Sequence, residues 1–236
     1  MNEKKWLACR DPEAMWVYLY KKGPSDRKLG LFGCACCRRI WHLLSDRRSR
    51  KAIEVAERDA DGQISEKKSS AAHKAAYEAQ QETADENSPG RGDNPGLQRA
   101  RWFAAYAAFQ AIDGDTQAAL SAIEAAALFA GPEGDAAYVA ATKHETKVQV
   151  RLLRCIFKNP FQPLPQIDPA WLTWGGDRIS HLARSIYETY DFTSLSVLGD
   201  ALEEAGCTDQ DILNHCRQPG EHALGCWILD LLLGKE

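Results

Sequence analysis

Cys34-Ala35-Cys36-Cys37-Arg38-Arg39-Ile40-Trp41-His42-Leu43-Leu44 is the stretch that decides how the chain is interpreted. On a helix its side chains separate into an apolar face and a charged face. The apolar face consists of Cys34, Cys37, Trp41 and Leu44, with Cys36, Ile40 and Leu43 beside it. Arg38 and His42 lie four residues apart and share the neighbouring face. The stretch therefore predicts a helix, from about residue 25 to residue 44, that is buried on one side and positively charged on the other.

Apolar side chains at helical spacing continue along most of the chain. Further helices are predicted over residues 11–20, 50–61, 65–82, 97–112, 116–130, 135–157, 177–190, 193–205 and 221–233. Asp11 before Pro12 marks a helix start, and Thr208, three residues before Asp211, is expected to cap a short helix. The sequence shows no hairpin signal and no alternating strand pattern. We therefore predict an all-α protein, a compact bundle of about nine or ten helices.

Two segments interrupt this pattern. Residues 87–96 are rich in Pro, Gly and Asn and predict an exposed loop. Residues 159–169 contain four prolines, which predict an extended strap against the body of the protein. We expect a single helical domain over residues 1–236, with a possible subdivision into a body, 1–158, and the strap with the C-terminal helices, 159–236. We also expect the cysteine helix and the helix of Trp227 to pack together.

The composition is that of an ordinary globular protein. The 236 residues are 44% hydrophobic and 26% charged, and the formal net charge is −4. This charge does not favour binding to nucleic acid, and no apolar run approaches the ~20 residues of a membrane span. The polar N-terminus lacks the apolar run of a secretory signal, so a cytoplasmic protein with free thiols is expected.

Cysteines and histidines form two groups that could hold zinc or iron. The first is Cys34, Cys36, Cys37 and His42, and the second is Cys207, His215, Cys216, His222 and Cys226. Cys34 and Cys37 have the C-x₂-C spacing, and Cys207, Cys216 and His222 could converge on a helix–turn–helix. Neither group matches a known finger spacing. Core thiols are the favoured interpretation, because free cysteine is among the most buried residue types. No cofactor is therefore expected, and zinc is the alternative.

A basic patch is the strongest candidate for binding. It consists of Arg38, Arg39, His42, Arg47 and Arg48, followed by Arg50 and Lys51. Such a patch could attract phosphate or an acidic partner. The favoured alternative is that these cations pair with the carboxylates of the next helix, which are Glu54, Glu57, Asp59 and Asp61.

Several runs resemble an uncharacterised family of planctomycete bacterial proteins. They are residues 25–29, 36–44, 52–58, 151–154, 159–161, 168–172, 200–207 and 225–227. The last of these runs begins the pattern Gly-Cys-Trp-x-x-Asp-Leu-Leu-Leu-Gly-Lys. The resemblance covers most of the chain except about residues 63–145, and it implies no activity, because that family has no assigned function.

Arg217 and His222 fit the R-x₄₋₆-H pattern of the HEPN family of helical ribonucleases. That resemblance implies that the two side chains position and protonate a phosphodiester. Pro219 and Gly220 interrupt the helix on which the family places the pattern. The favoured alternative is that His222 caps the final helix and that Arg217 lies at the C-terminus of the preceding one.

The sequence contains no complete catalytic constellation. Glycine-rich phosphate loops, the G-x-S-x-G elbow and the H-E-x-x-H motif are all absent. We therefore predict a non-enzymatic protein-interaction or scaffold protein with a protein partner. A metal-binding protein or a HEPN-like ribonuclease is the alternative, and nucleic acid is not the favoured partner.

Overall fold

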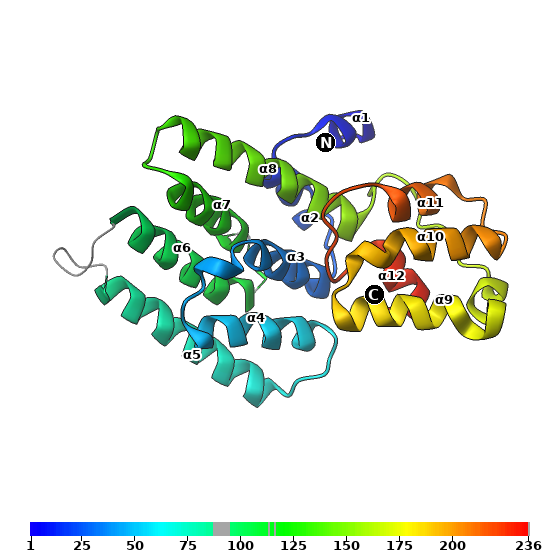
Figure 1. The fold of residues 1–236 in the computed structure, drawn as a ribbon, viewed down its shortest axis with the longest axis horizontal. Coiled ribbons are helices and arrows are strands. Elements are labelled where there is room, and N and C mark those ends of the chain that lie inside the picture. Colours follow the sequence, from blue (N-terminus) through cyan, green and yellow to red (C-terminus); the bar gives the residue numbers. More distant parts are fainter. Residues whose placement is uncertain (87–94, 113, 116, 236) are drawn as a thin grey trace. The chain divides into compact units, whose positions relative to one another are not determined.

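The chain is entirely helical in the parts that the structure describes. This computed structural model describes residues 1–86, 95–112, 114–115 and 117–235, which hold twelve α-helices, two short 3₁₀-helices and no strand (Figure 1). The α-helices are α1 (Glu3–Ala8), α2 (Pro12–Tyr20), α3 (Asp26–Arg39), α4 (Arg47–Ala60), α5 (Glu66–Glu86), α6 (Pro95–Ile112), α7 (Gln117–Ala130), α8 (Ala136–Phe157), α9 (Pro169–Thr189), α10 (Leu195–Glu204), α11 (Gln210–Arg217) and α12 (Trp227–Leu233). The 3₁₀-helices are η1 (Trp41–Leu43) and η2 (Phe192–Ser194). The all-α prediction is confirmed. Residues 87–94 of the predicted loop lie outside the described ranges.

Contacts within the chain divide it into two compact units. One unit is Cys9–Val150, and the other consists of Met1–Ala8 together with Arg151–Glu236. The division falls inside α8, and it groups α1 with the C-terminal helices, a pairing that the sequence did not predict. The cysteine helix and the helix of Trp227 belong to different units, so their mutual packing stays a prediction.

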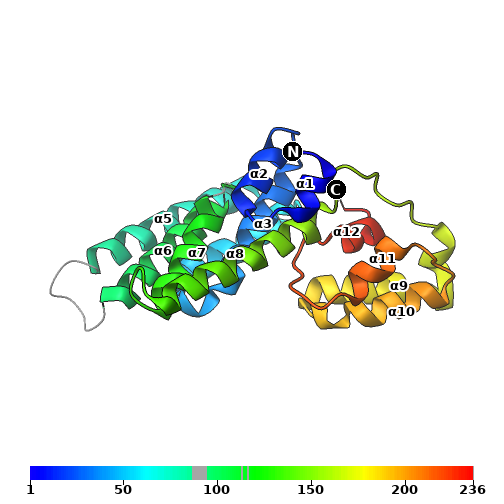
Figure 2. The ribbon, with the colours of Figure 1, turned by 90° about the horizontal axis from the view of Figure 1, so that it is seen from above.

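The Cys9–Val150 unit is built around a close pair of alanine-rich helices, α6 and α7, which lie side by side with α5 and α8 (Figures 1 and 2). The fully buried alanines are Ala100, Ala104, Ala107, Ala108 and Ala111 of α6, and Ala118, Ala122, Ala125 and Ala127 of α7. Small side chains let the helix axes approach closely, and alanine has the highest helix propensity. Gly33 of α3 extends this packing, because a Cβ there would lie only 3.4 Å from Ala111 and 3.5 Å from Ala118.

The cysteine helix is shorter than predicted. Helix α3 ends at Arg39, Ile40 leaves the helical conformation (φ −102°, ψ 21°), and a 3₁₀ turn follows. The break places the Trp41 ring next to two guanidinium groups, 4.3 Å from Arg38 and 5.6 Å from Arg50, and it still buries Leu43 and Leu44. Periodicity alone could not locate this break, because the same residues are apolar in a continuous helix.

Asp46 caps α4 and offers a test of this unit. Its carboxylate accepts hydrogen bonds from the Arg48 backbone (2.7 Å) and guanidinium (2.7 Å), and the guanidinium bonds lower the pKa of Asp46 from its ordinary 3.8. We expect Asp46→Ala to reduce the free energy of unfolding by about 1 kcal/mol at pH 7. The pKa of Asp46 is lower in the folded chain than in the unfolded chain. Its contribution to stability is therefore complete above the ordinary pKa and is lost as the pH falls through the lowered pKa. The difference between the two proteins should therefore shrink below pH 3.8 in urea titrations. Asp46→Asn, which retains a capping oxygen, should cost less, and a difference that does not shrink as the pH falls below 3.8 would contradict the assignment.

The second unit packs α9–α12 and the end of α8 around large apolar side chains. Trp6 of α1 and Ile156 of α8 are fully buried, as are Ile179, Leu202 and Ile212. Helix α9 is kinked, with left-handed backbone at Gly175 (φ 59°), Gly176 (φ 74°) and Asp177 (φ 61°). The predicted helix over 177–190 is therefore the second half of α9. Asp209 caps α11, accepting from Asp211 N (2.8 Å), so the expected cap at Thr208 was wrong by one residue.

The proline-rich segment after α8 is extended, as its sequence predicts (Figure 2). Phe161 and Ile167 are half-buried, whereas Leu164 is exposed. The start of the segment is attached to α1, because Asn159 Nδ2 and Gln162 Nε2 donate to Glu3 Oε1 over 2.7 and 2.8 Å. Arg154 also donates to the carbonyl oxygens of Trp6 (2.9 Å) and Leu7 (3.0 Å). These bonds hold α1 and satisfy carbonyl groups at its C-terminal end.

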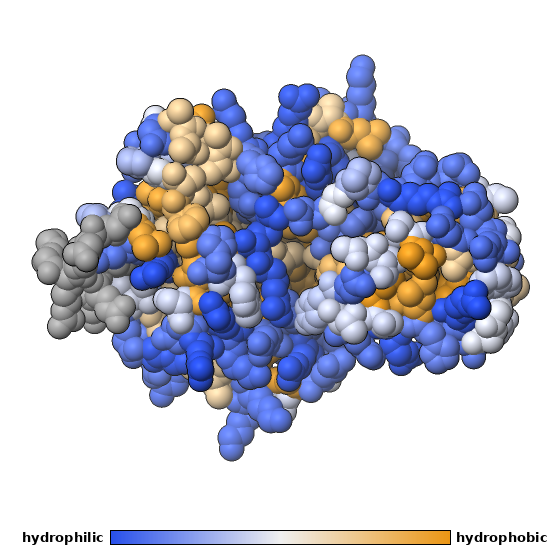
Figure 3. All heavy atoms as spheres, viewed as in Figure 1, coloured by the Kyte–Doolittle hydropathy of each residue, from blue (hydrophilic) through white to orange (hydrophobic). Residues whose placement is uncertain are grey.

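The surface is mainly hydrophilic in the view of Figure 3, with an apolar area over α7 and the first turns of α8. These two helices carry the exposed side chains Phe129 and Val139. No described helix combines the length and the apolar character needed to cross a membrane.

Candidate metal centre

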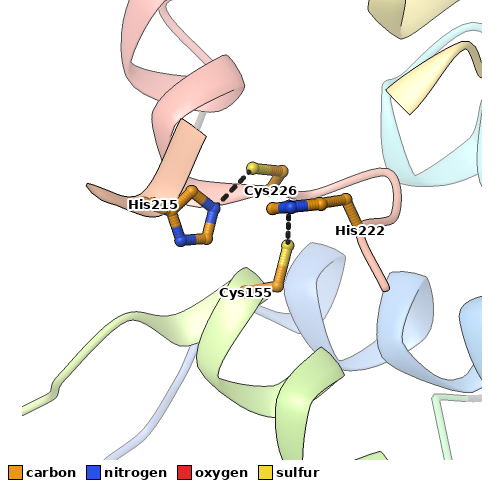
Figure 4. A group of neighbouring side chains, drawn as sticks. All are labelled: Cys155, His215, His222 and Cys226. Atoms are coloured by element: carbon orange, nitrogen blue, oxygen red, sulfur yellow. Dashed lines mark hydrogen bonds between the residues drawn. The ribbon is translucent and has the colours of Figure 1, made fainter. Parts of the chain in front are cut away.

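Two cysteines and two histidines point toward one another in the C-terminal unit (Figure 4). Cys155 comes from the last turns of α8 and His215 from α11, while His222 and Cys226 lie in the loop between α11 and α12. Cys155, His215 and Cys226 are buried, and His222 is half-buried. Helix α8 and the distant segment from α11 to the start of α12 thus deliver four soft or borderline ligands to one point.

The ligand atoms have nearly the spacing of a tetrahedral zinc site. His215 Nε2 lies 3.2 Å from Cys226 Sγ, and His222 Nδ1 lies 3.5 Å from Cys155 Sγ. All four atoms lie within 4.8 Å of one another. Zinc bonds of ~2.3 Å to sulfur and ~2.05 Å to nitrogen place tetrahedral ligands about 3.3–3.8 Å apart. Small side-chain movements would therefore complete the coordination.

The same distances favour one ion over a two-iron cluster. In a Rieske centre, the two cysteines hold one iron and the two histidines hold the other. Here each histidine contacts a cysteine, so the two pairs are intermixed. The arrangement fits a single tetrahedral S₂N₂ ion, which is typical of zinc.

The pKa values of the two thiols in the cluster are shifted in opposite directions. Burial raises the pKa of Cys226, but hydrogen bonds from Cys155, His215 and His222 and the electrostatic interaction with His215 outweigh it, so the pKa falls below its ordinary value. Cys155 has a raised pKa, because it donates its hydrogen bond to Cys226 and is itself buried. The pair therefore favours one thiolate, which is the form that binds metals.

Groups around the ligands orient them. Gln218 Nε2 lies 3.1 Å from His215 Nδ1, which leaves His215 Nε2 to face Cys226. A metal on Nε2 requires a proton on Nδ1, and the Gln218 amide oxygen can accept a hydrogen bond from Nδ1–H after the amide rotates by 180°. The His215 ring also packs against Trp227, with 5.1 Å between ring centroids, and edge-on to His222.

The structure brings together three residues of the second predicted metal group and adds a fourth. His215, His222 and Cys226 belong to the cluster, whereas Cys207 and Cys216 lie outside it. Cys216 packs against Gly199 of α10, and burial raises its pKa to about 12. Cys155 was missed because its neighbours in sequence form an ordinary apolar helix end, which gives no local sign of a ligand.

The three cysteines of the first predicted metal group are part of the core. Cys34, Cys36 and Cys37 are almost completely buried in α3, and burial raises their pKa values well above the ordinary one. His42 is exposed and lies edge-on to Phe129. Thiols kept neutral by burial act as small apolar side chains, which is the interpretation that the sequence favoured.

The basic patch is largely occupied by carboxylates. Arg38 bonds Glu57 through two nitrogens (2.9 and 2.5 Å), and Arg39 bonds Glu145 (2.7 Å). Arg48 bonds Asp46 and Glu82, and Lys51 bonds Glu54 (3.1 Å). Arg47 is exposed. The expected pairing with the next helix is seen between Arg38 and Glu57, whereas Lys51 and Glu54 pair within α4. Asp61 bonds Arg27, and Asp59 accepts from Ser69.

The two residues of the ribonuclease pattern have other partners. Arg217 bonds Asp200 (2.7 Å) and Glu203 (2.5 Å) of α10. His222 faces Cys155, and the expected cap of the final helix at His222 was wrong, because the N-cap of α12 is Cys226. Arg217 lies in the last turn of α11, where a cation is favourable.

A scan against protein-family models finds no match, and searches of curated proteins and of solved structures find none either. The resemblance to the planctomycete family stays a prediction.

Proposed function

We propose that the C-terminal unit binds one zinc ion through Cys155, His215, His222 and Cys226, and that the ion has a structural role. The convergence of four ligand atoms within 4.8 Å supports this proposal. Burying two imidazoles and two thiols together has a cost in hydrogen bonding that an apolar core avoids, and a metal ion would compensate for it.

A structural role follows from the number of ligands and their burial. Catalytic zinc sites keep a position open for water or substrate, whereas structural sites use four protein ligands. Here four protein atoms are available, and three of the residues are buried. This supports the non-enzymatic character predicted from the sequence. The protein-interaction or scaffold role stays a prediction.

Such an ion would add a direct link between short segments that also pack through buried apolar side chains. Helix α12 has seven residues and α11 has eight, and the loop between them contains Pro219 and Gly220. Helices this short are not stable alone. Ligands at the end of α8, in α11 and before α12 would fix all three.

Metal analysis of the purified full chain tests the proposal. We expect about one zinc per chain, and its loss in Cys226→Ser. Cys216→Ser is the matched control, because Cys216 is equally buried but lies outside the cluster, and it should retain zinc. Wild-type protein without bound zinc after purification and incubation with Zn²⁺, or equal zinc in both variants, would overturn the assignment.

A further inference from the structure

A cavity of about 290 Å³ opens beside the cluster within the C-terminal unit. Its walls come from α1, the end of α8, the start of the extended segment, α11 and the first residue of α12. At ~30 Å³ per water molecule, the volume corresponds to about ten waters, near the lower limit of small-molecule pockets.

Positive charge dominates the lining that the structure describes. Arg154 and Lys158 contribute two cations, and Asp211 contributes the single carboxylate. Side-chain amides of Asn159, Gln162, Asn214 and Gln218 complete the polar wall. The amides of Asn159 and Gln162 already donate to Glu3, so the two cations and the Asn214 amide are the groups that match a ligand which accepts hydrogen bonds and carries negative charge.

The Lys158 side chain is held in place by contacts within the protein and is nearly buried. Its side chain is only 9% exposed, and its backbone has the left-handed conformation (φ 55°) that ends α8. The Nζ atom donates to Pro163 O (3.1 Å), lies 3.3 Å from Asp211 Oδ2 and sits 5.2 Å from the centre of the Trp227 ring. A nearly buried ammonium held in this way needs an anion close to it.

Asp211 is a replaceable counter-ion. Its side chain is 57% exposed, in contrast to the buried lysine, and the carboxylate can rotate into solvent at little cost. We propose that a small oxyanion, either a carboxylate or a phosphate, binds in this cavity and takes the place of Asp211 beside Lys158. The Arg154 charge, which also holds the α1 carbonyls, adds to the attraction.

Calorimetric titration of the full chain with inorganic phosphate and with acetate, in an amine buffer, tests the proposal. Saturable binding of one anion per chain is expected, with glycerol as a neutral control that does not bind. Phosphate binding without acetate binding assigns phosphate esters as the ligand class, and the reverse assigns carboxylates. The absence of saturable binding with both anions would overturn the proposal.

Two variants should change the affinity in opposite directions. Asp211→Asn removes the competing carboxylate and should tighten binding about three- to tenfold, while Lys158→Gln should weaken it about tenfold or more. Lys4→Gln removes the same charge from the exposed surface of α1 and should change the affinity less than about twofold. If Lys158→Gln does not fold, Asp211→Asn decides alone, since unchanged or weaker binding there contradicts the proposal. Because α11 and the first residue of α12 line the cavity, the titrations use chain of measured zinc content, so that a failure of anion binding is distinguished from a failure of the zinc proposal.

Discussion

Removing the metal is expected to unfold α11, the following loop and α12 while the Cys9–Val150 unit stays folded. Structural zinc contributes on the order of 10 kcal/mol of apparent binding free energy, which is comparable to the total stability of a typical domain. The four proposed ligands join the end of α8 to both flanks of the loop. Hydrogen exchange with mass spectrometry, before and after chelation, should show protection lost over residues 210–233.

Peptides from α4 and α7 provide the internal control, because both helices belong to the other unit and should keep their protection. Adding Zn²⁺ back should restore the lost protection, whereas Mg²⁺, which prefers oxygen ligands, should not. A metal-free chain with unchanged exchange over 210–233 would show that the ion is not structural.

Glu145→Ala is expected to reduce the free energy of unfolding of the Cys9–Val150 unit by about 3–5 kcal/mol. The Glu145 side chain is 5% exposed and accepts from Arg39 Nε over 2.7 Å. The substitution removes this partner from a cation that is itself only 20% exposed. Chemical denaturation at pH 7 measures the effect.

An exposed pair provides the comparison. Lys51 and Glu54 are 57% and 37% exposed, and Glu54→Ala should cost less than about 1 kcal/mol. Replacing both members of the buried pair, as Arg39→Met with Glu145→Leu, should recover most of the stability, because no charge is then buried. A cost below about 1 kcal/mol for Glu145→Ala would show that the pair behaves as a surface pair.

Local signals in the sequence were sufficient for most helices. Asp11 with Pro12 gave the start of α2, since Asp11 caps the backbone of Glu13 (3.0 Å), and the alanine-rich helices began and ended close to their predicted limits. Helix α1 was not predicted, because six residues with a single large buried side chain give no periodicity. The first half of α9 was missed for a different reason: its capping residues, Asp168 and Pro169, lie in the proline-rich stretch.

The candidate centre was only partly accessible from sequence. His215, His222 and Cys226 are close enough in the chain to be considered together, whereas Cys155 is separated from them by α9 and α10. Contacts between residues so far apart are determined by the packing of the whole unit, which spacing rules do not describe. The carboxylate partner of Arg39 shows the same limit, because Glu145 follows it by 106 positions.

The grouping of Met1–Ala8 with Arg151–Glu236 has a consequence for how the protein is made. The Cys9–Val150 unit is complete as soon as those residues leave the ribosome, so it can fold while translation continues. Trp6 is synthesised early, yet its partners in the unit, from Arg154 onward, emerge only after the intervening helices. Helix α1 is therefore synthesised before the residues of its own unit. A nascent chain that pauses before residue 151 would leave the Trp6 indole without the contacts of that unit.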